Sequence, residues 1–260
     1  MASAKTAMPA GQQAADADLW VLDLGNTRLK LARVRGTSVV EVHVYPRTRR
    51  AEALAFLRTQ AAVGYALLST GGDAAWWAEP LAGTAPVWEY RPGSPCPLAV
   101  NYATLETLGV DRLAAAVGAQ ALWPRTELLV VDAGTCITCE YVGAAGVYLG
   151  GSIAPGLRMR LRAMHAFTGK LPEVAPVWPD SLDVGVDTAS AMRAGALGGA
   201  ARELAARVSA FRQNHPRGRV VVTGGDGPFL RPHLPTGLTY RPALVLEGLA
   251  HLHAYAHAPR

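Results

Sequence analysis

Two short turns in the sequence place an aspartate beside glycine and small polar residues, directly after an apolar run. Residues 20–30 read WVLDLGNTRLK, with Asp23 before the turn, and residues 128–135 read LLVVDAGT, with Asp132 in the same place. Glycine lets backbone N–H groups approach a ligand, and asparagine or threonine adds donors, so such a turn can bind phosphate oxygens. The aspartate would serve the magnesium ion that accompanies a polyphosphate, because that ion keeps several waters and needs few protein ligands. The two turns predict a bound nucleoside triphosphate.

A third glycine-rich turn, VVVTGGDGP at 220–228, follows another apolar run and could let a flat adenosine approach the backbone. The sequence contains no G-x-x-x-x-G-K-[ST], and no G-x-G-x-x-G follows a strand, which argues against P-loop and Rossmann nucleotide binding. One D-x-G-T is also an ordinary turn, but two copies on matched strands with a third glycine turn are a stronger signal.

The elements that must position these turns alternate between strands and helices. Runs with β-branched residues and period-2 alternation predict strands, and spaced apolar residues with few breakers predict helices. Strands are expected at 19–24, 28–35, 38–45, 65–69, 127–132, 136–142, 146–149 and 219–223, and helices near 50–62, 73–82, 111–122, 156–166, 188–212 and 243–256. This pattern predicts an α/β fold with antiparallel hairpins in its sheet. The stretch VWEYRPGSPCPLAVNY, rich in proline and glycine, is predicted to be a loop.

The strand–turn–strand unit occurs twice, because Asp132 follows Asp23 by 132 − 23 = 109 positions. The repeat predicts two similar domains, 19–122 and 123–260, joined near the segment WPRTE. Residues 1–18 have neither the apolar core of a secretory signal nor the arginines of a transit peptide, so we expect a disordered leader on a cytoplasmic protein.

Composition narrows the class of protein. Half of the 260 residues are hydrophobic, which allows a sizeable core, and no apolar run reaches the roughly 18 residues that span a bilayer. The net charge of +5 is scattered, with short clusters at Arg47, Arg49 and Arg50 and at Arg158, Arg160 and Arg162. It favours an anionic small ligand over nucleic acid, with a solvated face as the alternative.

The three cysteines, Cys96, Cys136 and Cys139, are too few for a disulfide framework. The last two form a C-x-x-C within a predicted strand, where positions i and i+3 point to opposite faces. We therefore interpret them as packing residues and not as a redox or zinc pair. His253 and His257 share a helical face near the end of the chain, and we expect both to be solvated.

The order of four motifs resembles the type III pantothenate kinases. They are D-x-G-N-T-x-x-K at Asp23 to Lys30, G-x-D-R at Gly109 to Arg112, D-x-G-T at Asp132 to Thr135, and GGSIAPG at 150–156. The resemblance covers about residue 19 to the C-terminus. It implies two ribonuclease H-like domains of the actin-like ATPase superfamily with an ATP cleft between them, and a homodimer. It also implies ATP-dependent phosphorylation of pantothenate to 4′-phosphopantothenate, the first step of coenzyme A synthesis.

The resemblance also implies roles for individual residues. ATP would be bound by Thr135 and by the first turn, which consists of Asp23, Leu24, Gly25, Asn26, Thr27, Arg28, Leu29 and Lys30. Pantothenate would be bound by Tyr102, Gly109, Val110, Asp111, Arg112 and Thr188. Asp23 would serve magnesium, and Asp132 a monovalent cation, potassium or ammonium. Asp111 would act as general base, and Arg112 can contact the substrate carboxylate with two hydrogen bonds.

Each narrower assignment has a structural alternative. Asp111 and Arg112 could be a helix cap with a surface arginine, Tyr102 a half-buried core residue, and Thr188 a plain N-cap. The chain also departs from the family after its second turn, where Cys136, Cys139 and Glu140 replace a small residue and a final aspartate. This leaves the monovalent-cation site less secure than the magnesium site.

Two other functions fit the phosphate turns. One is another phosphotransferase or a phosphatase of the same superfamily, because the turns bind phosphate and do not select pantothenate. The other is a non-catalytic nucleotide-binding protein that assists transcription. Asp23, Asp111 and Asp132 argue against the second, because a binding module needs no base.

Overall fold

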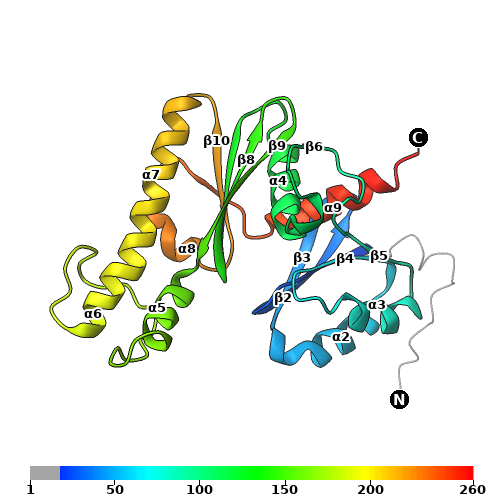
Figure 1. Ribbon diagram of the computed structural model, residues 1–260. Helices are drawn as coiled ribbons and strands as arrows, with labels where there is room; N and C mark the ends of the chain where they lie inside the picture. The colour runs from blue at the N-terminus through cyan, green and yellow to red at the C-terminus, as the bar shows by residue number, and fades with distance from the viewer. Residues whose placement is uncertain (1–17, 260) are drawn as a thin grey trace, which may run out of the picture. The chain divides into compact units, whose positions relative to one another are not determined.

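The computed structural model describes residues 18–259 (Figure 1). The predicted leader, residues 1–18, lies outside the described residues except for Asp18. Contacts divide the chain into two compact units. The first holds the described residues up to Cys96 together with Gly109–Ala114 and the segment from Val245 onward, and the second holds Pro97–Leu108 and Ala115–Leu244. The predicted ranges 19–122 and 123–260 stay a prediction, since this division cuts the chain at other points.

The first unit is built on a five-stranded sheet in the order β3-β2-β1-β4-β5. Its strands are β1 (Asp18–Leu24), β2 (Arg28–Arg35), β3 (Ser38–Pro46), β4 (Ala62–Ser69) and β5 (Val87–Glu89). The first three form antiparallel pairs, whereas β4 runs parallel to β1 and β5 parallel to β4. Every residue of β1 is buried, as expected for the central strand. Helices α2 (Arg50–Arg58) and α3 (Ala74–Ala82) supply Leu57 and Trp77 to the core on one face of this sheet.

The second unit is built on a six-stranded sheet in the order β11-β10-β7-β8-β9-β6. Its strands are β7 (Leu128–Ala133), β8 (Cys136–Gly143), β9 (Val147–Pro155), β10 (Arg219–Thr223), β11 (Thr239–Tyr240) and β6 (Ala99–Val100). Read from β9 to β11, this sheet repeats the strand order and directions of the first, with antiparallel pairs up to β7 and parallel pairs beyond it. The predicted repeat is therefore confirmed, because Asp23 and Asp132 occupy corresponding strands of two similar sheets.

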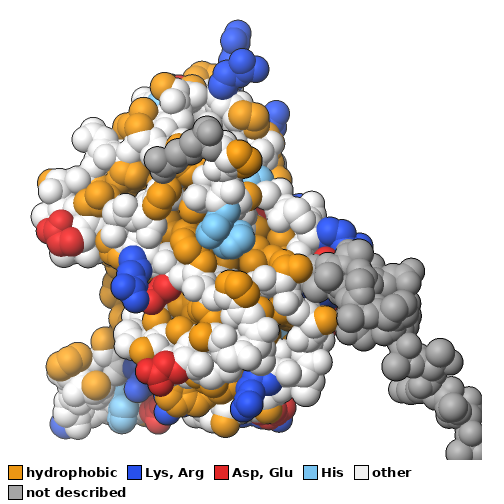
Figure 2. All heavy atoms as spheres, turned by 90° about the vertical axis from the view of Figure 1, so that its right-hand side faces the viewer, with side chains coloured by type: hydrophobic (Ala, Val, Ile, Leu, Met, Phe, Trp, Pro, Cys, Tyr) orange, Lys and Arg blue, Asp and Glu red, His pale blue; other side chains and the backbone are white. Residues whose placement is uncertain are grey.

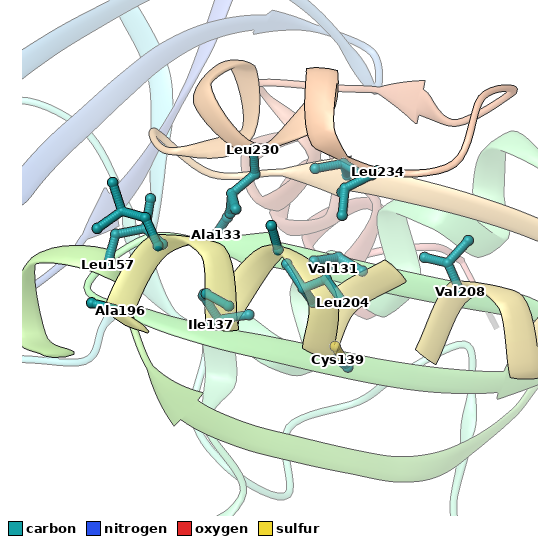
Figure 3. Close-up of a cluster of buried hydrophobic side chains, with 14 of the residues drawn as sticks. Val131, Ala133, Ile137, Cys139, Leu157, Ala196, Leu204, Val208, Leu230 and Leu234 are labelled. Carbon is teal, nitrogen blue, oxygen red and sulfur yellow. The ribbon is translucent and has the colours of Figure 1, made fainter. Parts of the chain in front are cut away.

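One face of the second sheet packs against helices to form a continuous apolar core (Figure 3). The strands supply Val131, Ile137 and Cys139, and the helix α7 (Gly199–Asn214) supplies Leu204 and Val208. Helices α5 (Leu157–Ala166) and α8 (Gly227–Leu230) close the same core. Cys139 lies within this core, so the interpretation of Cys139 as a packing residue in a strand is confirmed.

The remaining helical elements lie between the strands along the chain or follow the last of them. They are α4 (Val110–Leu122), α6 (Thr188–Arg193), α9 (Leu244–Ala256), a π-helical segment (Ala194–Gly198), and the 3₁₀ turns η1 (Arg47–Arg49), η2 (Leu105–Thr107) and η4 (Arg231–His233). The helix predicted over 188–212 is confirmed as one continuous helical run from Thr188 to Asn214, with the π segment as an irregular turn inside it. Gly198 in this segment packs closely on another loop, since a Cβ there would lie 2.5 Å from the carbonyl oxygen of Leu182. Among residues 18–259, no helix has the length and apolar character needed to cross a membrane.

Two expectations about strands are corrected. The sequence predicts a strand that ends at residue 149, yet β9 continues through two glycines to Pro155. Gly150 has a positive φ of 94° beside a register shift, and Gly151 passes so close to the Cys139 carbonyl that a side chain would collide with it. The predicted loop 87–102 contains β5 and β6, because pairing with β4 and β9 stabilises short strands whose sequence gives little local signal.

The prediction that both terminal histidines are solvated holds for His257, which is exposed, and is wrong for His253, which is half-buried. The rings of His253 and His257 stack with centroids 4.2 Å apart, and both meet the ring of Trp88 edge to face at 5.5 and 5.7 Å. Burial, with a smaller effect of the charge on His257, lowers the pKa of His253 to about 4. Figure 2 shows histidine side chains set among hydrophobic ones on the side of the molecule that faces the viewer.

Candidate active site

The first aspartate turn is the hairpin between β1 and β2. Asp23 and Lys30 are cross-strand partners, and the Lys30 ammonium donates to the Asp23 carboxylate at 3.1 Å. Only 9% of the Asp23 side chain and 21% of the Lys30 side chain are exposed, so the buried charge is compensated within the hairpin. A Cβ at Gly25 would lie 2.9 Å from the Arg28 carbonyl oxygen, which explains the glycine.

The residues of this turn divide into two sets. Asn26, Thr27 and Arg28 are exposed at its tip, where they can meet a ligand. Leu24 and Leu29 are fully buried members of the apolar core, so their side chains cannot contact ATP, and only their backbone could.

The G-x-D-R motif forms the N-terminal end of α4, in the same compact unit as the first turn. The Arg112 backbone N–H donates to Asp111 Oδ1 at 2.9 Å. A Cβ at Gly109 would lie 2.8 Å from the same oxygen, so glycine leaves room for the carboxylate. Arg112 is only 7% exposed and Val110 8%, which rules out the alternative of a surface arginine. A buried arginine beside an aspartate at a helix N-terminus is suited to an anionic ligand.

Three glycine segments meet at the second aspartate turn, in the second unit. Asp132 pairs with Thr138 of β8 and with Thr223 of β10. Gly224, with φ 87°, packs so closely on the Asp132 carboxylate and the Ala133 carbonyl that a side chain there would collide with both. The Gly156 N–H donates to the Thr135 carbonyl at 3.2 Å. The motifs D-x-G-T, GGSIAPG and TGGDG, which are far apart in sequence, thus form one site.

Tyr102 lies in the second unit, beside the glycines of β9. A Cβ at Gly150 would be 3.8 Å from the Tyr102 ring, and the rings of Tyr102 and Tyr148 have centroids 6.2 Å apart. The Tyr148 hydroxyl donates to Glu140 Oε2 at 2.6 Å, and Glu140 is only 1% exposed. Glu140, one of the residues by which the chain departs from the family pattern, is therefore held on Tyr148.

Thr188 is the exposed first residue of α6. The N-cap is Asp187, whose side chain accepts from the Ser190 backbone N–H at 2.8 Å while the Ser190 hydroxyl accepts from the Asp187 N–H. The bond from the Ser190 N–H lowers the pKa of Asp187. The alternative that Thr188 is merely the cap is wrong, because Asp187 fills that position.

Sequence reasoning missed three residues around these turns. Arg47 and Asp73 contact the first turn or its neighbours, and the hydroxyl of Thr223 is fully buried beside Asp132. Arg47 stood out only as part of a basic cluster, and a threonine at a strand end carries no signal of its own. Among the described residues, no group of three or more His, Cys, Asp or Glu side chains could hold a metal.

The two repeated sheets, each with its aspartate turn, define the fold class of the protein. They make up a two-domain fold of the actin-like kind, which solved structures share. A Baf family transcriptional activator from Campylobacter jejuni matches with a TM-score of 0.59 at 18% identity, covering 90% of this chain and 96% of that one. Component A of the (R)-2-hydroxyglutaryl-CoA dehydratase of Acidaminococcus fermentans matches with a TM-score of 0.51 at 17% identity, covering 92% and 98%.

Sequence comparison gives the particular family. The type III pantothenate kinase family matches residues 19–209. A type III pantothenate kinase from Porphyromonas gingivalis is 38% identical over 239 residues, covering 90% of this chain and 97% of the relative. One from Bacteroides fragilis is 38% identical over 231 residues, covering 88% and 94%. The chain belongs to the type III pantothenate kinase family, and the resemblance drawn from its motifs is confirmed.

Proposed function

We propose that the protein transfers the γ-phosphoryl group of ATP to the primary alcohol of pantothenate, giving 4′-phosphopantothenate at the first step of coenzyme A synthesis. The observation that carries this proposal is the start of α4, where Gly109 leaves room for an Asp111 carboxylate oriented by the Arg112 N–H. A binding module would not need an oriented carboxylate beside a buried arginine. The cytoplasm, where ATP is available, is the proposed location.

Asp111 would act as the general base. Oδ1 is held by the Arg112 N–H at 2.9 Å, so the carboxylate is positioned to orient the alcohol of pantothenate and accept its proton as the phosphoryl group is transferred. Arg112 would bind the substrate carboxylate, with Tyr102 and Thr188 as further contacts. These roles follow the family motifs, and the buried arginine supports them.

The first turn would bind the triphosphate through its backbone N–H groups, and Thr135 of the second turn would add a contact. Magnesium, when bound, supplies positive charge that stabilises the transferring phosphoryl group. Asp23 fits this ion, directly or through water, since it is a carboxylate at the end of a strand beside the glycine turn, with the Lys30 ammonium 3.1 Å away. Lys30 would share the neutralisation of phosphate charge.

The second turn also fits a monovalent cation. Thr223 Oγ1 is buried without a hydrogen-bond partner among the described residues, although an orphaned hydroxyl is costly. Thr223 and Asp132 are register partners on adjacent parallel strands, so their side chains lie on one face. Asp132 and Thr223 would hold potassium or ammonium, and Glu140, held by Tyr148, would not be required.

We also propose a homodimer. Phe167, Val184 and Val186 are 88%, 67% and 94% exposed near α5 and α6, the helix that begins with Thr188. Large apolar side chains in such numbers on one short region are suited to a protein partner. A second copy that covers them would bring Thr188 to the pantothenate of its partner.

The test is ADP release from ATP and magnesium, with and without pantothenate, in potassium or ammonium buffer. The Asp111→Asn variant should lose at least about 100-fold in turnover, the contribution of a positioned general base. Glu106→Gln, which changes an exposed carboxylate five positions earlier, is the matched control and should retain wild-type turnover. A folded wild-type protein without pantothenate-dependent turnover, or an equally active Asp111→Asn, would refute the proposal.

A further inference from the structure

Arg47, the first residue after β3, holds two carbonyl groups of the first phosphate turn. Its backbone N–H donates to the Thr27 carbonyl at 3.0 Å, and its guanidinium Nη1 donates to the Gly25 carbonyl at 2.7 Å. In a trans peptide the C=O and the following N–H point in opposite directions. The N–H of Asn26, which belongs to the same peptide as the Gly25 carbonyl, therefore points away from Arg47.

The guanidinium of Arg47 is itself held from the other side. Nη2 contacts Asp73 Oδ2 at 2.7 Å, and Asp73 Oδ1 accepts from the Ser69 hydroxyl at 2.9 Å. Only 25% of the Arg47 side chain and 15% of the Asp73 side chain are exposed. Burial alone would raise the pKa of Asp73, but the Ser69 hydroxyl and the Arg47 guanidinium lower it below its usual value, so the pair stays charged.

The space for this arginine is made by a glycine. A Cβ at Gly71 would lie 2.5 Å from Arg47 Nη2 and 2.8 Å from its Cζ, so the backbone of the loop after β4 lies directly against the guanidinium. The backbone N–H of Thr70, one residue earlier, donates to the Leu24 carbonyl at 3.3 Å. The loop after β4 thus contacts the turn both directly and through Arg47.

We infer that Arg47 and Asp73 are positioning residues for the nucleotide phosphates: Arg47 fixes the carbonyls of the turn so that its amides are oriented before ATP binds, and Asp73 fixes Arg47. The inference rests on the proposed function only in taking the turn as the phosphate site. Preorganised donors bind an anion more tightly because no ordering is required at the moment of binding. The expected effect is therefore on nucleotide affinity, with little effect on pantothenate.

Two variants test this in different ways. Arg47→Met removes the guanidinium, whereas Gly71→Ala keeps the charge and forces the guanidinium to move. Arg49→Met is the matched control, because Arg49 lies in the same 3₁₀ turn and its side chain, 58% exposed, pairs with Glu52 on the surface. Calorimetric titration with ADP and magnesium measures the affinity for nucleotide in the absence of pantothenate. Thermal melting shows whether each variant is folded, and steady-state kinetics give the KM values for ATP and for pantothenate.

Both test variants should bind ADP at least about tenfold more weakly and raise the KM for ATP by a similar factor, as expected for loss of a hydrogen bond to a charged group. Arg47→Lys can contact either the Gly25 carbonyl or the Asp73 carboxylate but not both. Its affinity for ADP should therefore lie between that of the two test variants and that of wild type. The KM for pantothenate and all properties of Arg49→Met should be unchanged. Folded Arg47→Met or Gly71→Ala that binds ADP like wild type would overturn the inference. If wild type binds ADP but never uses pantothenate, the proposed function fails while the titrations still decide the role of Arg47.

Discussion

Replacing Tyr148 with phenylalanine tests the energetics of the buried carboxylate at Glu140. The hydroxyl of Tyr148, a fully buried residue, donates to Glu140 Oε2 at 2.6 Å, and Glu140 is 1% exposed. Phenylalanine keeps the ring, so no cavity forms and the contact with the Tyr102 ring survives. What is lost is one hydrogen bond to a buried charge, which costs about 1.5–3 kcal/mol. For a chain of this size each kcal/mol lowers the melting temperature by about 2–4 °C, so a fall of about 3–12 °C is expected.

Scanning calorimetry of wild type, Tyr148→Phe and Tyr255→Phe measures this cost. Tyr255 is 52% exposed, and its hydroxyl has no hydrogen-bond partner among the described residues, so its variant should melt within about 1 °C of wild type. Glu140→Gln combined with Tyr148→Phe should cost less than the sum of the two single changes, because both remove the same contact. A Tyr148→Phe protein as stable as wild type would refute the view that Glu140 needs this donor.

Three other outcomes are expected. Thr223→Val should have a higher melting temperature than wild type in choline chloride, because it removes a buried hydroxyl that has no hydrogen-bond partner among the described residues. It should also lose the stabilisation that potassium chloride gives wild type at equal ionic strength, whereas Thr223→Ser should keep that stabilisation. An unchanged potassium effect in Thr223→Val would exclude Thr223 as a ligand. His253 has a folded pKa of about 4, below its unfolded value of 6.5, so the unfolded state binds more protons as pH falls from 6.5 to 4 and stability decreases. Melting of His253→Phe should lack this part of the pH dependence, and an identical profile would contradict the assignment. Burial raises the pKa of Cys139 to about 11, so iodoacetamide should label it only after unfolding, as peptide mass spectrometry can show; native labelling as fast as that of Cys136 would contradict this.

Local patterns were sufficient for most of the elements that carry the site. Strand β2 lies where an alternating pattern predicts it and β10 where a β-branched run does, and the hairpins around Asp23 and Asp132 follow from glycine turns between apolar strands. The sequence could not predict β5 or the glycine-rich half of β9. β5 is only three residues long and leads into a segment rich in proline and glycine, and the two glycines of β9 have weak strand propensity. Pairing with a neighbouring strand makes the extended conformation of both favourable.

The same division holds for the site. The family, the duplicated aspartate turns and the candidate base Asp111 can all be predicted from the sequence, because they depend on short motifs whose residues are neighbours along the chain. Tertiary structure alone decided which residues support them. Arg47 lies 47 − 25 = 22 positions from the Gly25 carbonyl it holds, and Thr223 lies 223 − 132 = 91 positions from Asp132. Such contacts form only when strands distant in sequence are paired, because a hydrogen bond requires its two atoms to lie within about 3 Å of each other. The sequence of one segment does not indicate which distant segment will lie beside it.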